Sequence, residues 1–444
     1  MRLLFGLSAY SRADGRLAPV RLVNLFVEQA PTSPGGTVAI PRPGLVEHTD
    51  AVTRAVYRED GVFGGDLFRI TGTTLYRDGV SIGTIAGSDR VEWAYTVDGL
   101  FILGGGIVYQ YDGATLAATA FPDSALVSSI TQMDSVVVAV RADAGTIYFR
   151  LAGDTVWNAL DFFSAERRPD PVLAVRTLGD TLFAFGSATV EQFAPTGNFQ
   201  TPFQRIGGTG LNRGIKDRDS LAQMDNTLFF VGEDDIVYRL TEGAPARMSD
   251  HGIEERIRLS ATAKAFSYTW EGHTFYVLGL ATETLVMDIA GGWSSYEVEG
   301  AAFPTVGLYD GVTTYVAGAK LWTLQDVNTD DGAPMERLFS AILPAEKPVL
   351  VDVIEVQLSP GTAAVNDEPA IVAMRWSDDQ GRTFTDWKEG TAGFSGQYRR
   401  RLRYRRGGMA DAPGRLYEFR ITDDVAVRFS DVSLNPANGG RSRP

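Results

Sequence analysis

The chain has 444 residues, of which 44% are hydrophobic and 22% charged, with 48 glycines, 24 phenylalanines and no cysteine. This composition excludes a disordered chain and indicates a turn-rich protein made mostly of strands, and the lack of cysteine excludes disulfides and thiolate metal sites. A formal net charge of −14 argues against nucleic acid bound over the whole surface, because phosphate binding needs a basic footprint. No apolar run reaches the roughly 18 residues of a membrane span, and the apolar run at the N-terminus is too short for a signal peptide. We therefore expect synthesis in the cytoplasm and no membrane insertion.

Residues 1–50 contain few alternating runs and several prolines and glycines, which predict an extended arm rather than a compact unit. Within this arm, residues 21–28 are compatible with one strand. Residues 40–45 must be extended, because the residue before a proline is pushed out of the helical region. An arm of this kind can cross a neighbouring subunit.

Residues 51–325 repeat one pattern, two short apolar runs joined by a glycine turn, which is clearest at 98–113. Glycine is favoured there because two-residue hairpin turns need a positive φ. Successive copies begin 34 to 47 residues apart, a spacing that fits the four-stranded blades of a β-propeller. Seven copies predict seven blades, or six if one weaker copy is a closing strand. We assign the hairpin to the inner strand pair of each blade. The copies begin at Gly65, Gly99, Asp134, Gly179, Asp225, Gly272 and Gly311.

Residues 326–333 are polar and turn-like, and we expect a linker there. Asp326, Asn328 and Asp330 resemble the start of a calcium loop. The glycine comes one residue late, however, and Arg337 stands where a bidentate glutamate is needed, which favours a solvated linker over calcium. Residues 334–444 then alternate at period two, which predicts an antiparallel β-sandwich that ends in a disordered tail. The expected fold is all-β, with an extended arm, a propeller and a sandwich.

Residues 377–384 match the S-x-D-x-G-x-T-[FW] pattern known as the Asp box. Its chemistry is local: Asp379 can accept backbone N–H groups across a turn that Gly381 bends and Phe384 anchors, and this favours a structural role over glycosidase activity. A glycosidase would need paired carboxylates that converge on the propeller axis, and the sequence shows no such set and no nucleophile with a base. We therefore expect no enzyme and no cofactor. The pattern is formed by Ser377, Asp379, Gly381, Thr383 and Phe384.

Six arginines lie between residues 399 and 406, in a C-terminal stretch, 391–444, that has 11 Lys or Arg against 5 Asp or Glu. That net charge of +6 leaves −20 on the preceding residues. On a strand, alternate arginines share one face. Three interpretations stay open: contact with an acidic surface of another subunit, which we favour, a solvated edge strand, or a patch that faces DNA. The alternate arginines are Arg399, Arg401, Arg403 and Arg405.

Several of these stretches resemble the tail-hub family of short-tailed bacteriophages, also called packaged-DNA stabilisation or head-completion proteins. The similar stretches are 23–28 with 42–45, then 164–175, 189–198, 202–210 and 247–254, and finally 376–384 with 396–401. The resemblance implies a propeller protein of the virion tail, made in the host bacterial cytoplasm. It implies a ring, with six subunits expected, below the portal and the head-tail adaptor.

The resemblance further implies that the ring seals and then passes double-stranded DNA and anchors tail fibres or spikes. For the arm, we expect contacts through Asn24, Phe26, Glu28, Pro43 and Gly44. The alternative, motivated by the Asp box and the aromatic content, is a carbohydrate-binding or sialidase-like glycoside-acting propeller. Turnover of fluorogenic glycosides, or binding to a glycan array, would favour that alternative.

Overall fold

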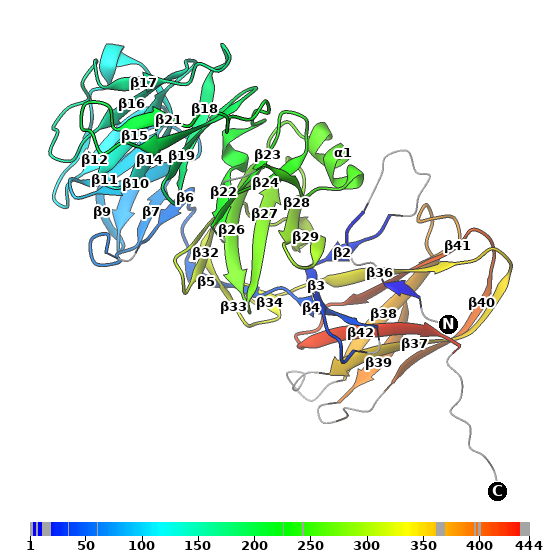
Figure 1. The fold of residues 1–444 in the computed structure, drawn as a ribbon. Helices are drawn as coiled ribbons and strands as arrows, with labels where there is room; N and C mark the ends of the chain where they lie inside the picture. Colours follow the sequence, from blue (N-terminus) through cyan, green and yellow to red (C-terminus); the bar gives the residue numbers. More distant parts are fainter. Residues whose placement is uncertain are drawn as a thin grey trace, which may run out of the picture.

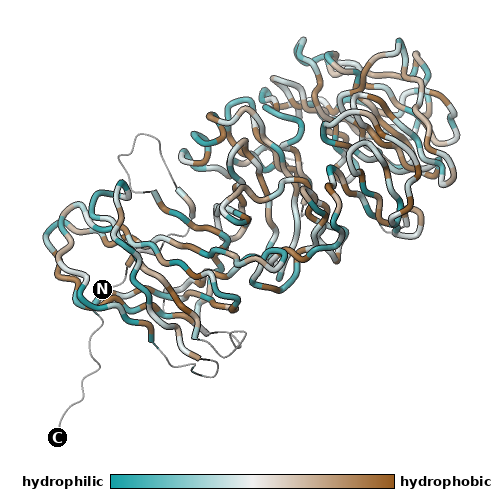
Figure 2. The backbone as a smooth tube through the Cα atoms, turned by 180° about the vertical axis from the view of Figure 1, so that it is seen from behind, coloured by the Kyte–Doolittle hydropathy of each residue, from teal (hydrophilic) through white to brown (hydrophobic). Residues whose placement is uncertain are grey.

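The computed structural model describes residues 3–435 except 6–7, 11–18, 34, 60, 225, 242–243, 361–368, 395–396 and 398–400. In these residues the chain forms a β-propeller and a β-sandwich, which lie side by side in one elongated body (Figure 1). Hydrophobic stretches run along the strands of both domains, and hydrophilic residues gather in the turns (Figure 2). The all-β fold expected from the sequence is confirmed.

The first six blades of the propeller each contain four consecutive antiparallel strands. Blade 1 contains β6 (Ala55–Tyr57), β7 (Phe68–Thr71), β8 (Thr74–Arg77) and β9 (Val80–Thr84). Blade 2 contains β10 (Glu92–Thr96), β11 (Gly99–Gly104), β12 (Ile107–Tyr111) and β13 (Leu116–Ala118). Blade 3 follows the short 3-10 helix η1 (Pro122–Ser124) and contains β14 (Val127–Met133), β15 (Val136–Arg141), β16 (Thr146–Arg150) and β17 (Phe162–Ser164).

Blade 4 contains β18 (Val172–Leu178), β19 (Thr181–Gly186), β20 (Val190–Pro195) and β21 (Phe203–Arg205). Blade 5 follows the 3-10 helix η2 (Arg218–Ser220) and contains β22 (Ala222–Met224), β23 (Thr227–Val231), β24 (Val237–Leu240) and β25 (Ala246–Arg247). Blade 6 contains β26 (Lys264–Trp270), β27 (His273–Gly279), β28 (Thr284–Asp288) and β29 (Gly292–Val298), and β30 (Ala301–Ala302) pairs with β29.

Blade 7 is completed by the N-terminal part of the chain. It contains β31 (Val306–Tyr309), β32 (Thr314–Ala317) and β33 (Leu321–Gln325), and its outer strand is β5 (Gly44–Thr49), which pairs antiparallel with β33. The described chain therefore has seven blades, the number that the seven hairpin copies predict. The hairpin of 98–113 supplies β11 and β12, so it is the middle strand pair of blade 2, and the assignment to an inner pair was wrong.

Seven apolar clusters hold the blades together, one between each pair of neighbours. Between blades 4 and 5, for example, the rings of Phe185 and Phe230 meet edge to face with centroids 5.3 Å apart. The helix α1 (His251–Leu259) precedes blade 6 and buries Ile253 and Ile257 against blades 5 and 6. Each fully buried large apolar side chain contributes roughly 1.5–3 kcal/mol, so packing between blades is the main stabilising term of the ring.

The sandwich consists of two packed sheets. One sheet has β1 (Leu4–Phe5), β2 (Leu22–Val23), β36 (Arg337–Pro344), β41 (Gly414–Ile421), β38 (Ala370–Ser377) and β39 (Lys388–Gly393). The other has β3 (Leu25–Gln29), β4 (Thr37–Pro41), β42 (Val427–Leu434), β37 (Val349–Pro360) and β40 (Leu402–Ala410), in that order. Their inner faces form one core that includes the stacked rings of Phe339 and Phe419, 5.0 Å apart.

The described residues of 1–50 are part of both domains, which differs from the expected extended arm. β2 pairs with β29 of blade 6 on one side and with β36 on the other, so a single sheet continues from the propeller into the sandwich. The hairpin of β3 and β4 packs Leu25 into the sandwich core, and it packs Phe26 and Ile40 into the cluster between blades 6 and 7. The physical reason is that each face of this hairpin buries apolar side chains against a different domain.

Candidate functional site

The joint between propeller and sandwich is built around the buried side chain of Arg42. Its guanidinium donates to both carboxylate oxygens of Asp330, at 2.9 and 2.6 Å, and Nε donates to Oδ1 of Asn24 at 2.9 Å. The guanidinium also lies over the ring of Phe303, 4.9 Å from its centroid. Because bidentate ion pairs are strong and directional, this contact ties together the two chain segments that connect the propeller to the sandwich.

Most of the residues expected to make the arm contacts are buried within their own chain. Asn24 and Phe26 are buried, and the Asn24 amide donates to the carbonyl oxygens of residues 297 and 336, at 2.9 and 2.8 Å. Pro43 and Gly44 are buried as well, and a Cβ at Gly44 would lie 2.2 Å from a backbone oxygen. Glu28 is exposed at the end of β3 and stays a candidate for contact with another molecule.

The segment 326–333 is also part of the joint, which differs from the expected solvated linker. It forms β34 (Thr329–Asp330), which pairs with β35 (Ala333–Pro334), and Asp330 is buried there. Arg42 and the N–H of Leu45 occupy the Asp330 carboxylate, and Asn328 accepts from a guanidinium at 3.4 Å. The described residues contain no group of three or more metal-ligating side chains, and Asp326 lies in no such group.

The basic strand, defined here as Arg401 with β40, lies at one edge of the five-stranded sheet. Leu402 and Tyr404 point into the sandwich core, whereas the arginines between them are exposed on the opposite face. Arg401 and Arg403 share the buried carboxylate of Glu355, at 3.2 and 2.8 Å. Two guanidinium groups against one carboxylate leave this face positive. Arg405 is exposed, and Arg399 lies outside the described residues.

The Asp box forms a turn that follows β38. Ser377 Oγ donates to Asp379 at 2.7 Å, and Asp379 Oδ1 accepts two backbone N–H groups of the turn, at 3.0 and 2.8 Å. The hydroxyl of Thr383 and these N–H groups lower the pKa of Asp379 well below its usual range. Gly381 has a φ of +90°, and Phe384 lies under a guanidinium 4.2 Å from its ring centroid. Both oxygens of the carboxylate accept hydrogen bonds from within the turn, so the geometry is that of a structural turn.

A buried charged network lies near the propeller axis, and the sequence does not predict it. Glu92 accepts from Arg176 at 2.9 Å and from the hydroxyl of Ser129 and the N–H of Ile130, each at 2.8 Å. Burial alone would raise the pKa of Glu92, but Arg176 and the hydrogen bonds outweigh burial and lower it. A carboxylate held ionised in this way ties blades 2, 3 and 4 together and is not suited to act as a general acid.

Two further contacts cross the axis. Arg90 donates to the carbonyl of Asp219 in η2, and Arg218 donates to the carbonyl of Ser128 in β14. The first strands of the blades contact one another in two groups, β10 with β14 and β18, and β22 with β26, β31 and β6. The two arginines therefore link one group of blades to the other. In the sequence these residues are recognisable only as charged residues beside apolar strands, and that pattern normally indicates exposed side chains rather than a buried network.

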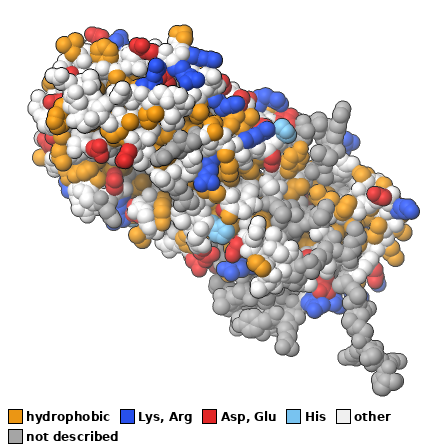
Figure 3. Space-filling view, viewed as in Figure 1, with side chains coloured by type: hydrophobic (Ala, Val, Ile, Leu, Met, Phe, Trp, Pro, Cys, Tyr) orange, Lys and Arg blue, Asp and Glu red, His pale blue; other side chains and the backbone are white. Residues whose placement is uncertain are grey.

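Basic side chains gather over the middle of the face of the molecule that Figure 3 shows, although the propeller is acidic as a whole. Residues 51–325 contain 20 Lys or Arg against 33 Asp or Glu, a net charge of −13. No helix in the described part of the chain is long and apolar enough to cross a membrane.

Comparison with known proteins matches both domains. A family model described as Bacteriophage P22 Gp10, beta-propeller, matches residues 1–315, and one described as Bacteriophage P22 Gp10, beta-sandwich, matches residues 336–436. The tail hub protein gp10 of Salmonella phage P22 is 27% identical over 172 residues, which are 35% of this chain and 35% of that protein. The matched stretch is thus a minority of that relative's length.

Two solved propellers are similar at low sequence identity. The Cps50 (Swd1) beta-propeller domain of Myceliophteria thermophila is 11% identical with a TM-score of 0.42, over 64% of this chain and 100% of that one. YCF48 from Cyanidioschyzon merolae is 12% identical with a TM-score of 0.42, over 64% of this chain and 99% of that one. Because the two family models together span the propeller and the sandwich, the chain belongs to the bacteriophage P22 Gp10 family.

Proposed function

We propose that this protein is a tail hub protein, a structural part of a phage tail that acts by assembly and shape and has no catalytic turnover. The observation that carries the proposal is the family match over both domains, one of whose members is a tail hub protein. The construction of the molecule supports it. A sheet that continues from blade 6 through β2 to β36 couples the two domains, as suits a ring subunit that must transmit force.

We further propose a ring of six copies below the portal and the adaptor, which seals the packaged DNA and later passes it. The net charge of −14 supports passage, because an acidic channel wall gains no counterion-release affinity for phosphates and lets DNA slide. A propeller also leaves few free strand edges that could pair with other chains. Tail fibres or spikes are the proposed partners at the far side of the ring.

The basic strand is the proposed contact between copies. Glu355 holds the guanidinium groups of Arg401 and Arg403 in place, so less side-chain entropy is lost when they meet a carboxylate on a neighbour. On the same outer side of the sheet, Leu350 and Met409 are cross-strand partners and are 60% and 51% exposed. An exposed apolar pair beside a positive strip suits a protein surface that is acidic with a small apolar centre, such as another copy's propeller.

The experiment is assembly on a template. Purified protein is expected to be monomeric by light scattering and to form a ring only when the neighbouring adaptor ring is added, as seen by negative-stain microscopy. Arg405→Glu should weaken ring formation, because Arg405 has no carboxylate partner in the part of the chain described and its loss leaves the fold intact. Arg382→Glu, on an exposed turn of the other sheet, is the matched control.

Three outcomes would contradict the proposal at different points. If Arg405→Glu forms rings as well as wild type does, the basic strand is not part of the interface between copies. A stable hexamer of isolated protein at micromolar concentration would remove the need for a template. Turnover of fluorogenic glycosides, or specific binding on a glycan array, would replace the hub role with the carbohydrate alternative.

A further inference from the structure

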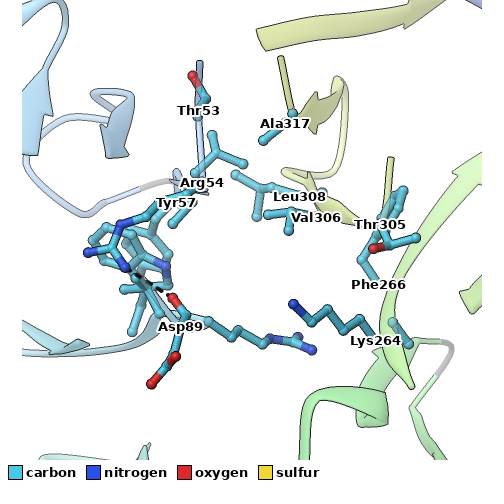
Figure 4. Close-up of a pocket in the computed structure, with 18 of the residues that line it drawn as sticks. Thr53, Arg54, Tyr57, Asp89, Lys264, Phe266, Thr305, Val306, Leu308 and Ala317 are labelled. Atoms are coloured by element: carbon cyan, nitrogen blue, oxygen red, sulfur yellow. Dashed lines mark hydrogen bonds between the residues drawn. The ribbon is translucent and has the colours of Figure 1, made fainter. Parts of the chain in front are cut away.

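Two cavities lie on the propeller axis, between the two groups of first strands. The first has a volume of about 310 Å³ and is lined by residues of blades 1, 2, 6 and 7. The second has a volume of about 430 Å³ and is lined by residues of blades 4 to 7 and by Arg90, which precedes the first strand of blade 2. Arg90, Phe266 and Leu308 line both cavities, so the cavities adjoin. Figure 4 shows the first of them, with Arg54 and Asp89 on one side and Lys264 on the other.

The charge of the cavity lining is opposite to that of the domain around it. Among the residues that the structure describes, four cationic side chains line the two cavities, against one carboxylate, that of Asp89. Residues 51–325 as a whole carry a net charge of −13. The lining therefore concentrates positive charge inside an acidic domain. The four cations are Arg54, Arg90, Arg176 and Lys264.

Three of these cations are not neutralised by a carboxylate hydrogen bond among the described residues. Arg54 donates to backbone carbonyls of residues 85, 86 and 89, and its buried Nε has no hydrogen-bond partner within the described part of the chain. Arg90 donates to a backbone carbonyl of η2. Lys264, the first residue of β26, is exposed and points toward the cavity, and the Asp89 carboxylate points away from it (Figure 4). Arg176 differs, because Glu92 pairs with it.

The surroundings strengthen any charge interaction inside the cavity. Burial lowers the pKa of Arg54 and of Arg90, which reports that their charged forms lack the solvation they would have in water. An anion placed between them would restore that stabilisation. One wall is aromatic, with Tyr57 stacked on Trp93 at a centroid distance of 5.2 Å. A flat apolar wall beside cations is typical of sites for small organic anions.

We propose that the axial cavity of the propeller binds a small polyanion that carries phosphate or carboxylate groups. Arg54, Arg90 and Lys264 supply the charge, and the aromatic wall contacts the rest of the ligand. The cavity is near the lower end of the range for small-molecule sites, roughly 300–1,000 Å³, which fits a solute such as pyrophosphate or citrate and excludes a DNA duplex. This function is separate from the hub role and does not depend on it.

The test is binding of pyrophosphate and of citrate to the full chain, measured by calorimetry and thermal shift at low ionic strength. We expect saturable binding of at least one probe with a stoichiometry of one per chain, and a thermal shift that grows with its concentration. A preference for pyrophosphate assigns a phosphate ligand, and a preference for citrate assigns a carboxylate ligand. Lys264→Ala should weaken binding about tenfold, equivalent to ~1.4 kcal/mol.

Lys264 is chosen because it is exposed and its loss does not disturb the buried network, whereas an Arg90 variant could misfold. Lys347→Ala removes an exposed lysine in the loop before β37 and is the matched control, expected to bind like wild type. Lys264→Glu should abolish binding while leaving the unfolding temperature of the free protein near that of wild type. Absence of saturable binding at millimolar probe, or equal weakening in Lys264→Ala and Lys347→Ala, would overturn the proposal.

Discussion

Replacing Arg42 by methionine tests whether the domain joint holds the two domains as one body. Methionine keeps most of the buried volume but removes the guanidinium, so the carboxylate of Asp330 is left buried with the N–H of Leu45, 3.2 Å away, as its remaining backbone donor. The Asn24 side chain also loses a donor. Breaking a buried ion pair on one side costs about 3–5 kcal/mol, since the remaining charge is neither paired nor hydrated.

This cost can be converted into an unfolding temperature. If all 444 residues unfold together, the entropy of unfolding is about 0.9 kcal/mol/K, from ~2.1 cal/mol/K per residue. A loss of about 4 kcal/mol then lowers the unfolding temperature by about 4 °C. We also expect wild type to unfold in a single calorimetric transition, because the continuous sheet couples the domains, although many two-domain proteins unfold in steps.

The matched control is Arg141→Met, which removes an exposed pair with Asp123 at 3.3 Å, where the two side chains are 38% and 67% exposed. Such pairs contribute about 0.2–1 kcal/mol, so its unfolding temperature should fall by about 1 °C or less. The double variant Arg42→Met with Asp330→Leu should recover part of the loss, because no unpaired charge is left. Scanning calorimetry measures all four proteins. Equal unfolding temperatures for Arg42→Met and Arg141→Met would refute the reasoning.

Three further predictions concern the axis, a hairpin and the Asp box. The pKa of Glu92 is lowered in the fold from its ordinary value of 4.5, so its ionised form stabilises the protein above pH 4.5, and this stability is lost as the pH falls through the lowered pKa. Glu92→Gln should therefore unfold at a lower temperature than wild type at pH 7, and the difference should shrink as the pH falls below 4.5. A gap independent of pH would contradict this. Gly99→Ala should destabilise the protein far more than Gly72→Ala in denaturant unfolding, because a Cβ at Gly99 would lie 2.2 Å from a backbone oxygen. A Cβ at Gly72 would enter open space, so that substitution costs only the backbone strain of a positive φ, about 1–2 kcal/mol. Similar losses of stability in the two variants would contradict the packing argument. Asp379→Ala should lower the unfolding temperature slightly, because the turn loses the acceptor of its backbone N–H groups, and should leave template-driven ring assembly unchanged. Loss of assembly would show that the turn is an interface.

The periodicity of the sequence is sufficient to predict the propeller. Gly99, Gly179 and Gly272 begin strands or turns at the spacing of blades, and all three have positive φ. The pattern does not reveal which strand of the blade the hairpin supplies. That depends on which strands line the axis, which is a property of the closed ring.

The role of the N-terminal residues could not be read from the sequence, because their partners are distant. Val23 pairs with Ser295 and with Leu338, and Ala39 pairs with Phe429. Short runs rich in proline give no period that identifies such partners. An arginine in the sequence normally indicates an exposed residue, whereas Arg42 is buried because it pairs with Asp330, 288 positions later.

For the candidate sites too, local features are predictable from the sequence and contacts between distant residues are not. The alternation of Leu402 and Tyr404 with Arg401 and Arg403 predicts which side of the strand is basic, because strand geometry is local. The carboxylate of Glu355 that holds these arginines comes from β37 and could not be predicted. The axial cavity is assembled from several blades, so neither its shape nor the convergence of Arg54 and Lys264 has a local sequence signal.

Cryo-electron microscopy of intact phage particles tests the central claim most directly. We predict density for the two-domain body in a closed ring of the tail, below the portal and around the axis of the DNA, with several copies per particle. The protein's absence from the tail, or its presence as an isolated single copy away from the DNA axis, would contradict the account.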